Sequence, residues 1–185
     1  MENKTIPFRV NRDIVIDMLV PHGVFMPNLT SALCAQVGLK IIEPNATALD
    51  LGCGAGAVGI ILAKNAQTKN PLFASDISPI AVQSAIFNFK KYDIQSDCRV
   101  SSLFDAWTGI KFDYIFDDIS GISEDLVGIS PWFADGVPCS SGPSGIDLSV
   151  RVIDQASNYL GKGGLIFPVL SLSNRREVID KAEQS

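Results

Sequence analysis

The stretch that most constrains this chain is residues 48–59, Ala-Leu-Asp-Leu-Gly-Cys-Gly-Ala-Gly-Ala-Val-Gly. An apolar run carries Asp50 near its end, four glycines follow closely, and a second apolar run begins at Ile60. Glycine lets a backbone approach a ligand where a Cβ would collide. A strand, a glycine-rich turn and a helix in this order indicate a cofactor crevice in a doubly wound α/β sheet.

Two classes of cofactor compete for this turn. Residues 54–59 fit the dinucleotide pattern G-x-G-x-x-G, and Asp76 follows at roughly the 20-residue spacing of a ribose-binding acid. Asp50 argues against a dinucleotide, because its carboxylate beside the helix start would repel a pyrophosphate. A cofactor with cationic groups and no phosphate, such as S-adenosylmethionine, suits that carboxylate better. A third interpretation stays open, in which Asp50 caps the turn and the glycines serve packing.

The motifs resemble those of a known superfamily. Residues 49–56 resemble motif I of the class I S-adenosylmethionine-dependent methyltransferases, and residues 74–79 (Ala-Ser-Asp-Ile-Ser-Pro) resemble their second motif. Within it, the chain is most similar to the HemK-like protein-glutamine methyltransferases, which modify peptide release factors. The likeness runs from about Val10 to Val169 and implies a three-layer α/β fold with a doubly wound, mostly parallel, Rossmann-like sheet. Further stretches that support it are residues 23–27, 81–88, 102–104 and 145–164.

The resemblance implies a cofactor site built from three turns. In it, Asp50 would orient the methionine end of S-adenosylmethionine and Asp76 would bind the ribose hydroxyls. Ile77 and Leu103 would sandwich the adenine, and Ser102 stands where the family usually has an acid. The cofactor-binding residues expected in this way are Asp50, Gly52, Cys53, Gly54, Gly56, Asp76, Ile77, Ser102 and Leu103.

The chain departs from the family where the acceptor would bind. HemK-like enzymes carry Asn-Pro-Pro-Tyr after the fourth strand, and the asparagine grips the substrate amide. Here Asp118 takes that place, the prolines and tyrosine are missing, and residues 28–31 (Asn-Leu-Thr-Ser) replace an Arg-Pro-Glu-Thr-like run. An ionised aspartate only accepts hydrogen bonds, so the site is poorly built for a glutamine amide. We expect Asp118 to position an amine or hydroxyl, or to accept its proton; the alternative is that it caps the loop.

Composition narrows the class of protein. The chain has 185 residues, enough for one domain, and its net charge of −5 argues against a broad nucleic-acid footprint. Its four cysteines lack metal or redox spacing and His22 is the only histidine, so we expect no metal. The scattered thiols predict a cytoplasmic protein. No apolar stretch approaches the ~20 residues that span a bilayer, so we expect no membrane partner.

The chain divides into an N-terminal arm, residues 1–28, and a cofactor-binding domain, residues 29–185. The arm is expected to form a hairpin about the turn at residues 21–23, either as a lid over the crevice or as a cap on the core. The loop 117–145 is expected to form the substrate-facing wall, where Trp132-Phe133 could stack on a substrate or pack on the core. Expected helices are 29–38, 58–65, 147–160 and two that begin near 78 and 173; expected strands are 46–51, 72–76, 99–101, 114–116 and 165–170.

After the last expected helix too little sequence remains for the antiparallel hairpin that class I methyltransferases add as strands six and seven. The resemblance therefore predicts an abbreviated fold or a fragment of a longer protein. An exposed sheet edge would then favour a homo-oligomer.

Three functions remain open from the sequence. The first is an S-adenosylmethionine-dependent methyltransferase that acts on a nitrogen or oxygen of a protein side chain, which the resemblance favours, or of an RNA or small molecule. The second is a non-catalytic module that binds the cofactor or a partner protein. The third is an NAD-dependent oxidoreductase.

Overall fold

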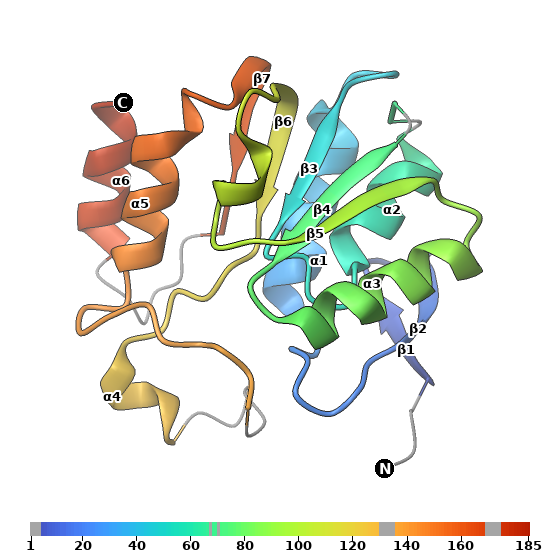
Figure 1. Cartoon of the computed structure of the whole chain (residues 1–185), viewed down its shortest axis with the longest axis horizontal. Coiled ribbons are helices and arrows are strands. Elements are labelled where there is room, and N and C mark those ends of the chain that lie inside the picture. The colour runs from blue at the N-terminus through green and yellow to red at the C-terminus, as the bar shows by residue number, and fades with distance from the viewer. Residues whose placement is uncertain (1–4, 67, 70, 130–135, 169–174) are drawn as a thin grey trace.

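The centre of the protein is a five-stranded parallel sheet (Figure 1). The computed structural model describes residues 5–66, 68–69, 71–129, 136–168 and 175–185. The strand order is β5-β4-β3-β6-β7, so the sheet grows from β3 in both directions. The point where the direction reverses, between β3 and β6, is where open α/β sheets bind their ligands. The strands are β3 (Ala48–Leu51), β4 (Leu72–Asp76), β5 (Ser96–Val100), β6 (Phe112–Asp117) and β7 (Leu160–Ile166).

Helices cover both faces of this sheet, which confirms the predicted three-layer, doubly wound architecture. Tyr114 and Phe116 of β6 pack in the core cluster that holds the first three helices. The residue between them, Ile115, packs in the other cluster with Val152. This alternation is the two-residue period of a strand that is buried on both faces. The helices are α1 (Leu29–Ile41), α2 (Ala57–Asn65), α3 (Pro79–Lys91), α4 (Glu124–Val127), α5 (Asp147–Ala156) and α6 (Arg175–Glu183).

The N-terminal arm forms a hairpin, but not where the sequence pattern placed it. β1 (Thr5–Arg9) pairs antiparallel with β2 (Val15–Leu19), whereas residues 20–28 contain no strand. The hairpin packs against α3: Leu19 N donates to Asn88 Oδ1 at 2.8 Å, and Asp17 N donates to the Tyr92 hydroxyl at 2.8 Å. The hairpin is therefore a cap on the core. Its position is decided by the buried sides of its two strands, which pack against the core, and not by the turn at residue 21.

The C-terminal strand differs from the expectation in a second way. Residues 161–164 (Gly-Lys-Gly-Gly), which lie between the expected helix 147–160 and the expected strand 165–170, belong to β7. The pairing with β6 is irregular there, and Gly163 takes φ +83°, where a Cβ would lie 2.4 Å from Asp113 O. Only glycine fits such a bulge. β7 is an outer strand of the sheet as far as the structure describes the chain, and an oligomer through this edge stays a prediction.

Candidate cofactor and acceptor site

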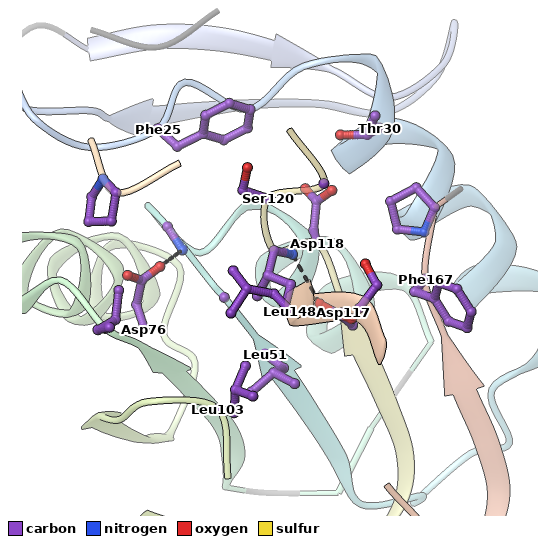
Figure 2. A pocket seen from close by; sticks show the side chains of 18 of the residues that line it. Phe25, Thr30, Leu51, Asp76, Leu103, Asp117, Asp118, Ser120, Leu148 and Phe167 are labelled. Atoms are coloured by element: carbon purple, nitrogen blue, oxygen red, sulfur yellow. Dashed lines mark hydrogen bonds between the residues drawn. The ribbon is translucent and has the colours of Figure 1, made fainter. Parts of the chain in front are cut away.

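A cavity of about 630 Å³ lies at the carboxyl ends of the central strands. Most of the predicted site residues line it, and Figure 2 shows three of them, Asp76, Leu103 and Asp118, around it. Three others do not line this cavity: Asp50, Cys53 and Gly56. The predicted residues that line it are Gly52, Gly54, Asp76, Ile77, Ser102, Leu103 and Asp118.

The glycines of the turn differ in the space that is available for a Cβ atom. A Cβ on Gly52 would lie 2.3 Å from Ile119 Cγ2, and one on Gly56 would lie 2.9 Å from Phe89 Cζ. Both glycines therefore have a packing reason inside the protein. All three glycines have a positive φ, but Gly54 differs in its surroundings, because the nearest atom to a Cβ there would be Phe25 O at 3.8 Å. Gly54 is thus the glycine that leaves room for a ligand.

Asp50 lies at the amino end of α2. Its side chain is 2% exposed, and its Oδ2 accepts a hydrogen bond from Gly59 N at 2.8 Å. The positive end of the helix is therefore occupied by a carboxylate and is not available to a pyrophosphate. Asp50 also lines a small hollow of about 20 Å³, which shares Gly52, Gly54 and Asp118 with the large cavity.

Cys53 lines the same small hollow and is buried. Burial, followed by the negative charges of Asp50 and Asp76, raises the pKa of its thiol well above the usual value. A thiol held in this neutral form is a poor nucleophile. Cys53 is therefore a small packing residue behind the turn.

Asp76 ends β4 and braces the glycine turn. Its Oδ2 accepts from Gly54 N at 2.9 Å and its Oδ1 accepts from Ser78 N at 2.8 Å. Burial raises the pKa of Asp76, and these backbone hydrogen bonds act in the opposite direction. Beside it, Ile77 is 58% exposed and lines the cavity. An acid and an apolar side chain thus lie together at this end of the cavity.

The turn after β5 carries the other two predicted residues, Ser102 and Leu103. Leu103 has φ +47°, a left-handed conformation that costs about 1 kcal/mol or more for a residue with a Cβ. Ser101 holds this turn, because its Oγ donates to Leu103 O and accepts from Ala106 N, both at 3.0 Å. No local sequence pattern identifies Ser101, since its role depends on the folded turn.

Asp118 follows β6 and lines both cavities. Its Oδ2 accepts from Ser31 Oγ at 2.5 Å, while the nearby Thr30 hydroxyl donates to Asn28 Oδ1 at 2.8 Å. Both hydroxyls belong to the first turn of α1, where Asn28 and Ser31 form a capping box. The two places where the sequence departs from the HemK-like pattern, residues 28–31 and Asp118, therefore meet in the structure.

A further carboxylate, Asp117, was not among the predicted site residues. It is 2% exposed, lines the cavity and accepts from Ile119 N at 3.0 Å. Burial is the main cause that raises the pKa of Asp117 and of Asp50 to about 7, and the pKa of Asp118 to about 6. The negative charge of Asp118 raises the first two further. The adjacent acids at the end of a buried strand were a signal that could have identified Asp117.

Part of the long loop forms a wall of the cavity, as expected. Pro138 and Ser140 line it, and Ile122 makes an isolated β-bridge with Ser140. Ser120 Oγ donates to Cys139 O, which ties the start of the loop to its end. Trp132 and Phe133 lie outside the described residues, so their role stays a prediction.

Apolar side chains that the sequence did not single out complete the lining. Phe25, ahead of α1, and Leu148, on α5, both line the cavity, as does Phe167 after β7 (Figure 2). His22 is exposed and is not among the lining residues. Within the described ranges, no group of three or more His, Cys, Asp or Glu side chains is placed to hold a metal ion. None of the helices in those ranges has the length and apolar character to cross a bilayer.

The chain is similar in sequence to known methyltransferases. The release factor glutamine methyltransferase of Geobacter sulfurreducens is 24% identical over 168 residues, which cover 89% of this chain and 59% of that protein. The ribosomal protein L11 methyltransferase of Thermosipho melanesiensis is 38% identical over 112 residues, 60% of this chain and 42% of that protein. The chain spans about half the length of these curated relatives.

Solved structures share the fold. The T. thermophilus 16S rRNA N2 G1207 methyltransferase, solved with AdoMet and guanosine, superposes with a TM-score of 0.68 at 16% identity. The match covers 97% of this chain and 45% of that one. The family model described as "Methyltransferase small domain" matches residues 22–118, which include the glycine turn and the ends of β3, β4 and β6. Because this match covers more than half of the chain, the protein belongs to the methyltransferase small domain family.

Proposed function

We propose that this chain binds S-adenosylmethionine at the ends of β3 and β4 and transfers its methyl group to a nitrogen or oxygen acceptor. The observation that carries the proposal is the carboxylate of Asp50 at the amino end of α2. It favours a cationic, phosphate-free ligand at the position where a dinucleotide would place its pyrophosphate. Family membership and a solved neighbour that contains AdoMet support the same cofactor.

The cavity fits such a cofactor. Its volume of about 630 Å³ lies within the range of small-molecule and cofactor sites. Gly54 leaves space for a ligand to approach the backbone, and Asp76 lies where it can accept hydrogen bonds from ribose hydroxyls. Ile77 and Leu103 provide apolar contacts for the adenine. The carboxylate of Asp50, which lines the small hollow, would compensate the charge of the cofactor's ammonium group.

When bound, the cofactor supplies an activated methyl on a sulfonium. The residues of this chain contribute orientation and exclusion of water, which are the main sources of rate in methyl transfer. Asp118, at the wall between the two cavities, would position the acceptor atom. Phe25 and Phe167 would exclude water from the reacting atoms.

The acceptor molecule is left open by this proposal. The relatives include enzymes named for protein and for rRNA substrates, so either class is compatible with the family. A protein side chain is favoured here only through the HemK-like pattern of the sequence.

Calorimetry with S-adenosylhomocysteine and NADH tests the cofactor. We expect S-adenosylhomocysteine to bind and NADH to give no heat of binding at equal concentration. Tight binding of NADH would instead support the oxidoreductase alternative. Incubation with labelled S-adenosylmethionine and cell extract then separates an enzyme from a binding module, because a module would bind the cofactor without transferring label.

A further inference from the structure

We propose that the acceptor is a basic amine that enters as its ammonium form, and that Asp118 takes the proton before the nitrogen attacks the methyl. This inference rests on the proposed function and names the class of its substrate.

The cavity has a one-sided charge distribution. Three carboxylates line it, from Asp76, Asp117 and Asp118, and its described lining contains no Lys, Arg or His. A cavity of this kind repels anionic groups and concentrates cations. A phosphate-rich acceptor has no cationic partner here, whereas nucleic-acid binding depends on such contacts. The charges therefore favour a cationic acceptor over a nucleic acid.

The hydrogen bonds of Asp118 favour its ionised form. Ser31 Oγ donates to its Oδ2 at 2.5 Å, and the Ser31 and Thr30 hydroxyls of this helical turn both act to lower the pKa of Asp118. Hydroxyl groups that donate to a carboxylate stabilise the charged form and lower its pKa, against the effect of burial. Asp118 is thus held ready to accept a further hydrogen bond or a proton.

An amide acceptor would need a donor as well, for its carbonyl oxygen. The hydroxyls of the α1 turn beside Asp118 are engaged, because Ser31 donates to Asp118 and Thr30 donates to Asn28 Oδ1. Ser120 donates to Cys139 O. A carboxylate cannot donate, so an amide carbonyl placed beside Asp118 would face a negative charge. An ammonium carries donors only, and it matches a carboxylate in both charge and hydrogen bonding.

Apolar walls complete the match to an alkyl amine. Phe25, Leu148 and Phe167 line the cavity and offer contacts to an aliphatic chain (Figure 2). An ammonium that leaves water for such surroundings needs a carboxylate to compensate its charge. Asp118 and Asp117 provide that compensation.

The step balances without a further reagent. The ammonium gives one proton to a carboxylate oxygen of Asp118 and becomes a neutral amine with a free lone pair. That lone pair forms the new nitrogen–carbon bond, while the electrons of the carbon–sulfur bond go to sulfur and neutralise the sulfonium. The product nitrogen carries the positive charge, and Asp118 releases its proton to solvent.

The pH dependence of this step follows from the groups around Asp118. Burial raises its pKa to about 6, so the carboxylate is mainly ionised at pH 7.5. The titratable groups that interact with it are Asp50 on β3, Asp117 on β6 and Cys34 on α1. The rate of transfer should therefore fall as the pH falls through about 6. Loss of the Ser31 hydroxyl should raise the pKa of Asp118 and move this fall to higher pH.

Two small probes test the acceptor class, n-hexylamine and hexanamide, each with methyl-labelled S-adenosylmethionine. They share an alkyl chain and differ in the head group. We expect label in N-methylhexylamine, and at least about 10-fold less in the amide, because a carbonyl left without a donor costs 1–3 kcal/mol. Equal or preferred labelling of hexanamide, or no labelling of hexylamine, would overturn the inference. Calorimetric binding of S-adenosylhomocysteine is measured alongside; if it is absent, the proposed function itself fails.

Variants at the carboxylate and its donor make the test specific. Asp118→Asn should lower the rate with hexylamine by at least about 100-fold, the effect of a lost general base, with cofactor affinity within about 2-fold of wild type. Asp105→Asn, at an exposed position outside the lining, is the matched control. In Ser31→Ala, the pH below which the rate falls should be higher than in the wild type, because the lost hydroxyl raises the pKa of Asp118. An unchanged hexylamine rate in Asp118→Asn, or an unchanged pH profile in Ser31→Ala, would contradict a proton-accepting role.

Discussion

Ser31 Oγ donates to Asp118 Oδ2 at 2.5 Å, although the two residues are 87 positions apart in the sequence. The bond ties the capped amino end of α1 to the end of β6 at the wall of the cavity. Each partner alone is a departure from the HemK-like pattern. Together they form one unit, in which the Ser31 hydroxyl, within the run that replaces the family's pattern at 28–31, supplies a donor to a buried aspartate.

The charge of Asp50 should contribute to cofactor binding. Asp50→Asn keeps an oxygen that can accept from Gly59 N but removes the negative charge near the small hollow. We expect the affinity for S-adenosylmethionine to weaken by on the order of 1–3 kcal/mol, the range of a hydrogen bond to a charged group. Isothermal titration calorimetry measures this, with Asp105→Asn as the control. Unchanged affinity would show that Asp50 only caps α2.

The same residue should make the stability of the free protein depend on pH. Burial raises the pKa of Asp50 to about 7, above its value of about 4 in an unfolded chain. The folded state therefore holds a proton that the unfolded state has lost. Its contribution is fully present below pH 4 and is lost as the pH rises through about 7.

Urea denaturation of wild type and Asp50→Asn between pH 4 and pH 8 measures this contribution. The wild type should lose up to about 4 kcal/mol more unfolding free energy over this window than the variant does, because each unit of pKa difference corresponds to about 1.4 kcal/mol. Parallel curves would indicate that Asp50 is ionised in the folded protein across the whole range.

Alanine substitutions at two glycines of the turn should distinguish a loss of cofactor binding from a loss of packing. Gly54→Ala places a Cβ toward the cavity, whereas Gly56→Ala places one 2.9 Å from Phe89 Cζ. Both positions have positive φ, so each substitution carries a similar backbone strain. We expect Gly54→Ala to raise the Kd for S-adenosylhomocysteine at least about 10-fold, because a Cβ blocks close approach of the ligand.

Gly56→Ala should instead lower the melting temperature more than Gly54→Ala does. Differential scanning fluorimetry and calorimetry on the two variants give both quantities. A larger loss of affinity in Gly56→Ala would argue that this glycine, and not Gly54, faces the cofactor.

Ser101 should increase the affinity for the cofactor indirectly, because it stabilises the turn after β5 that carries Leu103. Ser101→Ala removes the hydroxyl that bonds both Leu103 O and Ala106 N. Leu103 would then relax from its left-handed conformation, and the adenine would lose an apolar contact. We expect a loss of S-adenosylhomocysteine affinity on the order of 1–3 kcal/mol.

A comparison with S-methyl cofactor fragments that lack adenine distinguishes this role from general destabilisation. The affinity for methionine alone, measured by its competition with S-adenosylhomocysteine, should be the same in Ser101→Ala as in the wild type. Ser157→Ala, at an exposed position, is the control. Equal losses for both ligands would mean that Ser101 supports the fold rather than the adenine end of the site.

The parts of the site that the sequence predicted lie in local patterns. Asp50 and the glycines belong to one strand–turn–helix segment, and Asp76 ends the next strand at the expected spacing, so a single β–α–β unit brings them together. β4 was predicted with its observed bounds for the same reason, because a short apolar run between turn residues leaves little freedom. The hairpin was misplaced because its pairing is decided by contact with α3.

The sequence by itself determined the fold class, the position of the glycine turn and the negative charge of the side chain that precedes it. Only the tertiary structure decided which groups surround the cavity. The bonds of Asp118 with Ser31, the burial of Asp117 and the apolar wall from Phe25 to Phe167 join segments that are far apart in the chain. Local propensity cannot encode such contacts, because they form only when helices and strands pack and their side chains compete for the same buried space.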